Sequence, residues 1–381
     1  MALELVGPLG TEFTHFLRGF RPFFPSSETL DHFDNYVRGL LSDLSRKTVE
    51  PIALACGTVV RTLQQFLKAC QWDQHGLVRA TQQRLAVEMP SSVGDPLGTV
   101  GIIDETSSLK KGDKTPGVQR QYLGCVGKIE NGIVSVHLAV VRGGAKALLA
   151  NDLFLPKAWS HDRERCRKAD IPDALKHQPK WQLALAQVGQ AQDNGWHFDW
   201  LVFDEGYGSK TSFLRLMDIV GQRYIGEVPK SFSCRTATRN KNQRAEALFA
   251  DPAVPKKKAK TLRMAQQTVA DTVWSVQSMP VCLGDDTVPK HRLVRGQNLS
   301  TGEVKYWITN AARTVGLRLL VKVALQRWQV EHTFRVAKQE VGLMHFEGRS
   351  YQSLVRHWAL CLVALAFVTL HTHELKKKIP T

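Results

Sequence analysis

The spacing of hydrophobic residues predicts that the first part of the chain is helical. Apolar residues recur there every three or four positions, which is the period of an α-helix with one buried face. The segments with this spacing are residues 30–41, 52–70 and 76–88. In the second of them, Val59 and Leu63 are expected to face inward, whereas Arg61 faces outward. The pattern therefore predicts an all-helical N-terminal domain over residues 1–92.

After a turn-rich stretch at residues 89–96, short apolar runs replace the helical spacing. Residues 98–103 form one such run, which leads directly into Asp104. Residues 198–203 form another, which leads into Asp204. Short apolar runs bounded by turn residues are typical of buried strands. Both aspartates are therefore expected at the C-terminal ends of strands.

The residues between and after these two runs complete the prediction of an α/β core. The dipeptide Asn131-Gly132 lies between two β-rich stretches, which predicts a hairpin turn at that point. Residues 180–193 have helical spacing, and a further helix and strand are expected over residues 211–228. Strands that alternate with helices indicate an α/β fold. The first part of this core is assigned to residues 93–228.

The composition changes again after residue 228. A basic, turn-like stretch is followed by runs of strand composition at residues 272–281, 291–294 and 304–309. A β-rich insertion is therefore expected over residues 229–312. Residues 313–381 are predicted to form the second part of the core, with a C-terminal helix and a short basic tail at Lys376–Lys378. The apolar run at residues 358–370 is too short to span a bilayer, so it is expected to be a buried helix.

One segment near the C-terminus combines helical spacing with a distinctive set of charges. Residues 317–341 contain no helix breaker, so one helix ending near Gly342 is expected. The residues expected on its charged face are Arg327, Glu331, Arg335 and Lys338. Those expected on the adjoining apolar face are Val323, Val330, Phe334, Ala337 and Val341. A carboxylate among three cations suits a metal ligand beside a polyanion, although a surface helix with intrahelical salt bridges has the same pattern.

Charge and composition favour a globular protein that binds nucleic acid. The chain of 381 residues has 51 Lys and Arg against 35 Asp and Glu, a formal net charge of +16. An excess of this size points to a polyanionic partner, nucleic acid before membrane. The seven cysteines are far apart and include no Cys-x-x-Cys pair, so neither a zinc site nor a disulfide framework is expected. With no secretory signal apparent, we expect a cytoplasmic, nucleoid-associated protein with no membrane partner.

Asp104, Asp204 and Glu331 form a candidate acidic triad. Carboxylates without nearby His or Cys select Mg²⁺ or Mn²⁺. Two such ions about 3.5–4 Å apart can activate an attacking oxygen and stabilise a leaving oxygen at a phosphodiester. Phosphoryl transfer needs little from the protein beyond placement and charge, and Arg327 and Lys338 could hold the phosphates. An aspartate after a strand also commonly starts a turn, so each aspartate alone is weak support.

Several motifs resemble those of a known family. They are Tyr36–Leu41 with Arg46-Lys47 and Glu50–Ala53, Ile103–Thr106 with Gly117–Tyr122 and Gly127–Asn131, Asp204–Gly208, and the spacing of Arg327, Glu331 and Lys338. Together they resemble the DDE transposases of bacterial insertion sequences, specifically the insertion sequence 701 family within the insertion sequence 4 group. The resemblance covers about residues 30–360. One departure is Ala324, which stands where the group's signature has a tyrosine in a region that helps position the DNA end.

The resemblance implies an RNase H-like core, interrupted by a β insertion between the second aspartate and the glutamate. It also implies cut-and-paste transposition, in which metal-assisted hydrolysis at the element ends precedes strand transfer of the 3′-OH into target DNA. The partner would be double-stranded DNA, both the terminal inverted repeats and the target, bound by a homodimer, with no small-molecule substrate. The helical domain at residues 1–92 is expected to bind DNA, although a plain helical cap would have the same pattern.

Relatives pass through a DNA hairpin, a step in which an aromatic side chain can hold a flipped base. Trp307 and Trp328 are candidates for this role, and either is equally consistent with a core position. Lys110 and Lys111 follow Asp104, where a basic loop either contacts phosphate or is simply solvated. Two further hypotheses remain on the sequence alone: a metal nuclease or resolvase on the same core without strand transfer, and a domesticated DNA-binding protein that retains no catalysis.

Overall fold

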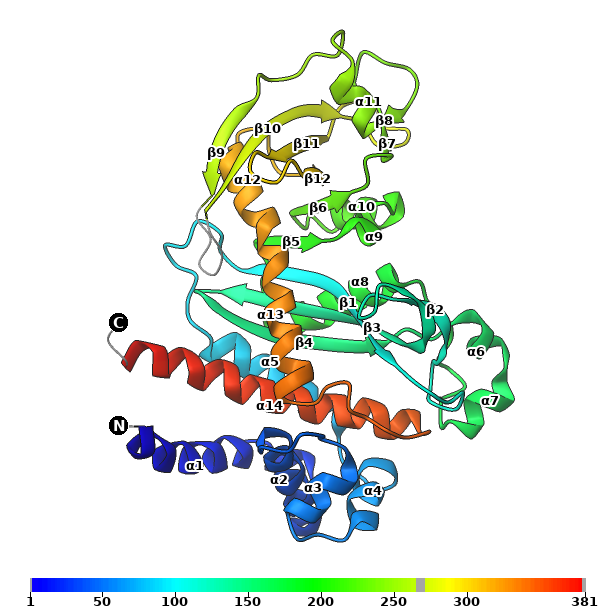
Figure 1. The fold of residues 1–381 in the computed structure, drawn as a ribbon, viewed down its shortest axis with the longest axis vertical. Helices are drawn as coiled ribbons and strands as arrows, with labels where there is room; N and C mark the ends of the chain where they lie inside the picture. The colour runs from blue at the N-terminus through cyan, green and yellow to red at the C-terminus, as the bar shows by residue number, and fades with distance from the viewer. Residues whose placement is uncertain (1, 265–270, 379–381) are drawn as a thin grey trace.

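A computed structural model describes residues 2–264 and 271–378, with side chains described between residues 10 and 372 of those ranges. A ten-stranded mixed sheet runs through this part of the chain, in the order β2-β3-β1-β5-β6-β12-β11-β10-β9, with β4 paired to β3. Helices from both ends of the chain lie beneath one end of the sheet (Figure 1). The two ends of the described chain therefore lie near each other.

The core strands have the pairing expected of an RNase H-like fold. They are β1 (Val100–Leu109), β3 (Lys128–Arg142), β4 (Ala145–Leu153), β5 (Trp200–Phe203) and β6 (Tyr224–Val228). β1, β3 and β4 are antiparallel neighbours, and β5 and β6 continue the sheet parallel to β1. The predicted fold class is confirmed, although the strand at residues 145–153 was not anticipated.

The hairpin predicted at Asn131-Gly132 is wrong. β2 (Gln119–Leu123) turns into β3 at residues 124–127, where Gly127 has a φ of +67°. Asn131 and Gly132 lie inside β3, and the Asn131 side chain donates to the carbonyl of Lys110 at 2.6 Å. A Cβ on Gly132 would stand 2.4 Å from the Ser108 carbonyl oxygen, so the glycine permits a close approach of β3 to β1.

The strands predicted in the insertion are present, and they extend the core sheet. They are β10 (Thr272–Val281), β11 (His291–Asn298) and β12 (Val304–Thr309), and an additional strand that was not predicted, β9 (Lys260–Met264), pairs with β10. β12 pairs antiparallel with β6, from Tyr306 opposite Val228 to Thr309 opposite Ile225. After β6 in the chain, β7 (Ser233–Cys234) and β8 (Gln243–Arg244) form a separate two-stranded sheet, and α11 (Ala245–Ala250) follows them. The sheet therefore continues from the core into the insertion, across the domain boundary predicted at residue 229.

The N-terminal part is helical as predicted, with one correction. Its helices are α1 (Ala2–Arg18), a 3₁₀ turn (Arg21–Phe23), α2 (Ser27–Leu41), α3 (Val49–Ala55), α4 (Val60–Lys68) and α5 (Gln74–Glu88). Residues 52–70 form two helices rather than one, because Gly57 adopts a φ of +64° between them. Val59, expected to face inward, lies in this break and is 70% exposed, whereas Leu63 is buried.

The N-terminal helices pack around the C-terminal helix α14 (Tyr351–Lys378), which contacts α2, α4 and α5 as well as β4. The Tyr36 hydroxyl lies 3.0 Å from Nδ1 of His357 in this interior. Residues Tyr351–Thr372 are long and apolar enough to cross a membrane, but 72% of the span is buried inside the protein. The predicted buried helix is confirmed within this longer one. The side chains of the basic tail at Lys376–Lys378 lie outside the described residues.

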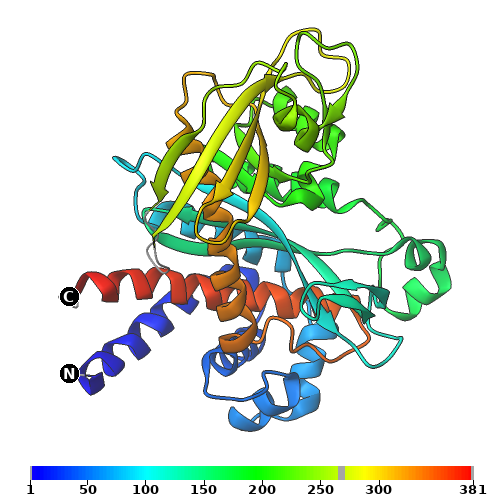
Figure 2. The same cartoon turned by 45° about the horizontal axis from the view of Figure 1, so that its top comes forward.

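The remaining helices follow β4 along the chain, and several of them pack on the core strands. They are α6 (Lys157–His161), α7 (Arg163–Lys168), α8 (Lys180–Asp193), α9 (Glu205–Gly208), α10 (Thr211–Ile219), α12 (Leu317–Ala324) and α13 (Gln329–Arg335). α12 contacts β5 and β6, and α13 contacts β1, β3 and β4. The path from α12 to α13 therefore crosses the core strands, as Figure 2 also shows.

Replacing Gly226 with Ala is expected to destabilise the core at the strand next to β5. A Cβ at Gly226 would stand 1.8 Å from the Phe203 ring, and Phe203 directly precedes Asp204. Overpacking of this kind costs about 3 kcal/mol of unfolding free energy, measured by urea titration. Gly189→Ala in α8 is the control: a Cβ there meets nothing within 4 Å, so stability should rise by up to about 1 kcal/mol. Wild-type stability of Gly226→Ala would contradict this packing.

Candidate active site

The register of two parallel strands brings Asp104 and Asp204 together. The last paired position between β1 and β5 is Ile103 opposite Phe203, and each aspartate is the next residue along its strand. β1 continues to Leu109, so Asp104 lies within a strand rather than at its end. Asp204 does end its strand, and its Oδ1 accepts hydrogen bonds from the backbone N–H groups of Gly206 (3.0 Å) and Tyr207 (3.4 Å).

Burial is the main cause that raises the pKa values of both aspartates. Burial, followed by the negative charge of Asp204, raises the pKa of the Asp104 carboxyl to about 6, while Arg327 opposes the shift. Burial also raises the pKa of Asp204, and the N–H of Tyr207 is the largest opposing influence. Two neighbouring carboxylates that are both buried favour a cation between or beside them.

Arg327 supplies a cation within a group of carboxylates. Its Nη1 lies 3.1 Å from Oδ2 of Asp104, and its Nη2 lies 3.8 Å from Oε1 of Glu331. Its Nε lies 4.0 Å from Oε2 of Glu227. The Arg327 side chain is 18% exposed and that of Asp104 is 16% exposed, so water screens their attraction only weakly.

Glu227 is a member of this group that was not predicted from the sequence. It lies in β6, and its Oε1 accepts from the Lys305 ammonium of β12 at 2.8 Å. Lys305, Glu227, Arg327 and Asp104 thus form a chain of alternating charges that runs from the insertion to the first aspartate. The available signal was a single glutamate in an otherwise uncharged strand beside the one that ends in Asp204.

The helical segment that carries Glu331 is continuous but not a uniform α-helix as predicted. A 3₁₀ segment (Leu325–Trp328) separates α12 from α13, and a π segment (Val336–Glu340) follows α13. The segment ends where predicted, at Gly342, which has a φ of +77°. The predicted apolar face is buried as a whole: Val323, Val330, Phe334, Ala337 and Val341. The changes in winding occur on either side of Glu331.

Among the predicted phosphate-binding residues, Lys338 and Lys110 are partly buried. The Lys338 ammonium lies 5.7 Å from the centroid of the Phe334 ring, and burial lowers its pKa. Lys110 donates to the carbonyl of Phe346 at 2.7 Å. Arg335 and Lys111 are exposed. Contact of these four residues with DNA stays a prediction.

The two candidate tryptophans lie in different environments. Trp307 is buried, with its ring centroid 5.9 Å from that of Trp274. Trp328 is 53% exposed and lies three residues before Glu331. Only Trp328 therefore offers a ring face to a base without repacking of the core.

Glu105, the neighbour of Asp104, serves a different contact. It forms an ion pair with Lys180 of α8. This contact ties α8 to β1 beside the aspartate pair.

The carboxylates fit Mg²⁺ or Mn²⁺ by their chemistry, since all are hard oxygen donors. Their arrangement fits only in part. The structure brings Asp104 and Asp204 together, but across the described residues no three His, Cys, Asp or Glu side chains converge as a metal site. Glu331 is 51% exposed and lies against Arg327 instead. Asp104 and Asp204 are therefore the residues best placed to hold a cation, with Glu331 nearby.

Comparison with known proteins places the two aspartates in a recognised family region. A sequence profile described as DDE superfamily endonuclease matches residues 19–280, which is more than half of the chain and includes Asp104 and Asp204. The chain is also 32% identical over 208 residues to the "Probable transposase for insertion sequence element IS701" of Microchaete diplosiphon. That alignment covers 54% of this chain and 50% of the relative, so the chain spans about half the length of the protein it matches. Glu331 lies beyond the profile match.

Replacing Asp104 with Asn is expected to stabilise the metal-free protein at about pH 8 by roughly 2 kcal/mol. The folded-state pKa of about 6 lies above the ordinary value of 3.8, so the ionised carboxylate destabilises the fold above pH 6. As the pH falls from about 6 to about 4, the wild-type carboxyl takes up a proton and this cost disappears. The stability difference should therefore shrink with falling pH, as measured by urea titration in the presence of a chelator.

The control for this experiment is Asp285→Asn, because the Asp285 side chain is fully exposed. Its unfolding free energy should stay within about 0.5 kcal/mol of wild type at both pH values. If the Asp104→Asn protein is no more stable than wild type at about pH 8, the ionised Asp104 carboxylate does not destabilise the fold.

Proposed function

The chain belongs to the DDE superfamily endonucleases, and from this premise we propose that it is a DNA transposase. The proposed reaction is metal-dependent cleavage at the ends of an insertion sequence, followed by strand transfer of the 3′-OH into target DNA by a cut-and-paste route. The observation that carries the proposal is the pair of buried aspartates aligned by the register of β1 and β5, with Arg327 bound to one of them.

Asp104, Asp204 and Glu331 would hold the divalent ions. When bound, Mg²⁺ or Mn²⁺ would supply positive charge to the attacking and leaving oxygens of the phosphodiester. The backbone N–H groups of Gly206 and Tyr207 hold the Asp204 carboxylate in one orientation. The low exposure of Asp104 keeps water from screening charge at the site.

Arg327 would act on the phosphate. Its guanidinium already lies at the site, and a planar fork of N–H donors can contact two oxygens of one phosphate. Glu227 lies 4.0 Å from Nε of Arg327 and is paired with Lys305, which favours this position of the guanidinium before DNA binds. Burial lowers the pKa of Lys338, and the negative charge of Asp104 acts in the opposite direction. Lys338 would add a second cation near the phosphodiester.

Three finer features belong to the same proposal. A hairpin on the transposon end would need an aromatic residue for the flipped base, and the exposed Trp328 near Glu331 suits that role. Two coordinated cuts would need a homodimer on two DNA ends. The substrate would be double-stranded DNA in the bacterial cytoplasm, in association with the nucleoid.

A metal nuclease or resolvase without strand transfer is the second candidate function. The matched family is described by endonuclease activity, which both candidates share. The two differ in their products: a transposase joins the 3′-OH of its own end to a second duplex, whereas a nuclease only cuts. A domesticated DNA-binding protein would retain neither reaction.

The test is cleavage and joining of a labelled duplex that carries the element's own end, with Mg²⁺ or Mn²⁺. Replacing Glu331 with Gln is expected to reduce nicking at the end boundary by more than about a hundredfold while duplex binding persists, because charge stabilisation by bound metal contributes several kcal/mol. Glu340→Gln, on the π segment that follows α13, removes the same charge outside the site and should cut like wild type.

Each outcome separates the candidates. Nicking with joined product that depends on Glu331 supports the transposase, and nicking without joining favours the nuclease. Binding without cleavage by the wild-type protein favours the domesticated binder. Equal cutting by wild type and Glu331→Gln would mean that Glu331 is not a metal ligand.

A further inference from the structure

A pocket with a volume of about 300 Å³ lies in the insertion, which we call the insertion pocket. It is formed by the end of β10, the start of β11, the segment that leads into β9 and the loop that follows β12. None of its described lining residues is Asp or Glu, whereas five are cations: Lys256, Lys257, Lys290, Arg292 and Arg313. The pocket shares no lining residue with the group around Asp104 and Asp204.

Much of the remaining lining of the insertion pocket is apolar. Met279 and Ala311 are buried residues of this lining, and Pro255 and Pro280 contribute further apolar surface. His291 also lines the pocket, but its Nε2 already lies 2.9 Å from Oδ2 of Asp218. A concave site with apolar walls and a few charged groups is the usual form of a pocket for a small organic ligand.

Arg292 is the cation of the pocket with the least solvent exposure. It is 8% exposed, and its guanidinium donates to the backbone carbonyl of Val315 at 2.9 Å and, at longer distances, to those of Ala312 and Arg313. Its Nε has no hydrogen-bond partner among the described residues. Carbonyl groups carry no net charge, so the positive charge is not compensated, and burial lowers the pKa of Arg292. Buried charges in proteins are normally paired.

Two other arginines that donate to backbone carbonyls are compensated in a different way. Arg356 is 6% exposed, and its guanidinium lies 4.6 Å from the centroid of a Trp72 ring. Arg142 lies 4.7 Å from the centroid of a Trp196 ring. The negative face of an aromatic ring stabilises a cation. Among the described residues, Arg292 has neither a ring nor a carboxylate in such a position.

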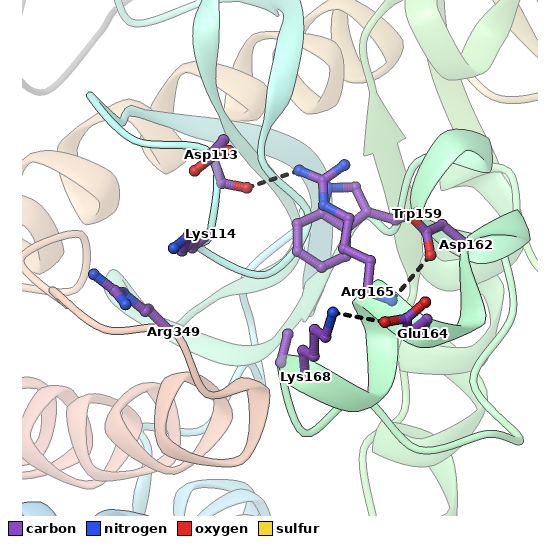
Figure 3. A pocket seen from close by; sticks show the side chains of 9 residues that line it. Asp113, Lys114, Trp159, Asp162, Glu164, Arg165, Lys168 and Arg349 are labelled. Atoms are coloured by element: carbon purple, nitrogen blue, oxygen red, sulfur yellow. Dashed lines mark hydrogen bonds and ion pairs between the residues drawn. The ribbon is translucent and has the colours of Figure 1, made fainter.

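The larger hollow beside α6 and α7, with a volume of about 510 Å³, is nearly balanced in charge. Three carboxylates and four cations line it. Lys168 pairs with Glu164 at 2.6 Å, and the Arg165 guanidinium lies 3.8 Å from the centroid of a Trp159 ring (Figure 3). The insertion pocket differs from this hollow because no carboxylate lines it.

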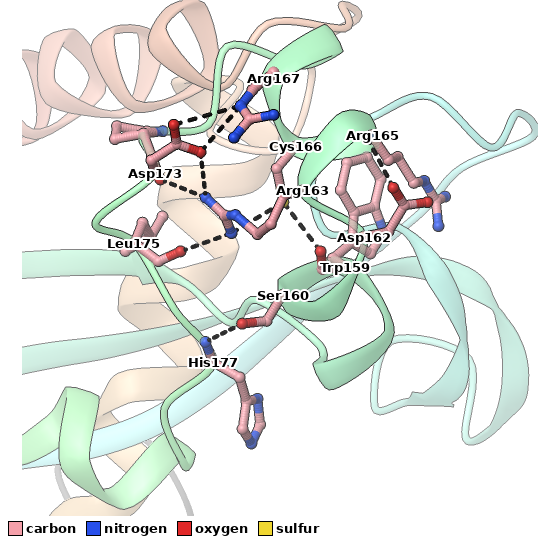
Figure 4. A network of polar contacts seen from close by, with 11 residues as sticks. Trp159, Ser160, Asp162, Arg163, Arg165, Cys166, Arg167, Asp173, Leu175 and His177 are labelled. Atoms are coloured by element: carbon pink, nitrogen blue, oxygen red, sulfur yellow. Dashed lines mark hydrogen bonds and ion pairs between the residues drawn. The ribbon is translucent and has the colours of Figure 1, made fainter.

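The other arginines of α7 also have carboxylate partners. Arg163 and Arg167 both contact the Asp173 carboxylate, with nitrogen–oxygen distances of 3.3 Å (Figure 4). This short run of basic residues therefore serves contacts within the protein. A cluster of cations without carboxylates, as in the insertion pocket, is not a general consequence of the high net charge.

The remaining cations of the insertion pocket keep most of their charge available. The Lys256 ammonium donates to two backbone carbonyls at 2.8 Å each, and Arg313 donates to one at 3.2 Å. Lys290 has a carboxylate partner, Asp286 at 3.7 Å. The Lys257 side chain is exposed and forms no hydrogen bond or ion pair with any residue that the structure describes. Cations already held in place lose little entropy when an anion binds.

We propose that the insertion pocket binds a small organic anion, in which a carboxylate or phosphate group is joined to an apolar body. The cations would hold the anionic group, and Met279 and Pro280 would pack against the body. Because Arg292 is almost buried, a molecule that enters the pocket reaches it more readily than the backbone of a duplex does. The proposal goes beyond the proposed function and does not depend on it, since it involves neither DNA nor the catalytic carboxylates.

The test is isothermal titration calorimetry of the full chain with phenyl phosphate and with benzoate. Each anion should bind at one site, and the tighter of the two identifies the preferred anionic group. Benzyl alcohol, which has the same ring without a charge, should bind at least about tenfold more weakly because it forms no charge-assisted hydrogen bond.

Replacing Lys257 with Gln should raise the Kd of the preferred anion by about fivefold, because it removes one cation from the pocket. The side chain is exposed and unpartnered, so folding should not change. Replacing Arg292 with Gln should weaken binding further, but it also removes contacts to backbone carbonyls. The matched control is Lys258→Gln, the exposed neighbour that does not line the pocket, which should bind within about twofold of wild type.

The outcomes separate this proposal from its alternatives. Failure of wild type to bind either anion would overturn it, as would equal affinity of wild type and Lys257→Gln. Equal binding of benzyl alcohol and the anions would make the ligand apolar and would overturn the anionic class. Displacement of phenyl phosphate by a short duplex would assign the pocket to a DNA surface instead. Asp104→Asn should bind the anion like wild type, so loss of cleavage and loss of the pocket are measured independently.

Discussion

The parallel pairing of β1 with β5 is the constraint on which the site depends. Once Ile103 is fixed opposite Phe203, the residues that follow them must lie side by side, and both are aspartates. A shift of one residue would turn one aspartate to the opposite face of the sheet. The buried strand that ends in Asp204, the turn capped by Asp204 and the antiparallel pairing of β1 with β3 all fix this register. The chemistry thus follows from backbone pairing.

The aspartate pair also determines the charges around it. Two carboxylates in a site that is mostly shielded from water need a cation nearby, and Arg327 supplies one. The guanidinium contacts carboxylates from three separate elements: β1, β6 and its own helical segment. Its position reflects the excess of negative charge at the site.

Much of this organisation can be predicted from the sequence because it is local. The apolar runs before Asp104 and Asp204, and the helical spacing of residues 180–193, are each visible within a short window. The hairpin prediction failed because Asn131-Gly132 has the composition of a turn, whereas Gly132 is required by the close approach of β1, a contact between distant residues. The same limit applies to Glu227 and to the changes of helical winding around Glu331, since both depend on tertiary packing. A candidate triad can be proposed from the sequence, but whether its side chains converge cannot be predicted from it.

The continuity of the sheet from β6 into β12 has a mechanical consequence. Because β12 is hydrogen-bonded to β6 and carries Lys305, the insertion is attached to the site both through the backbone and through a series of charges. A ligand that tilts the outer strands β9 to β12 would pull on Glu227 and so on the guanidinium beside Asp104. In that sense the insertion is a lever arm: load applied at the far edge of the sheet would reach the buried carboxylates through hydrogen-bonded strands.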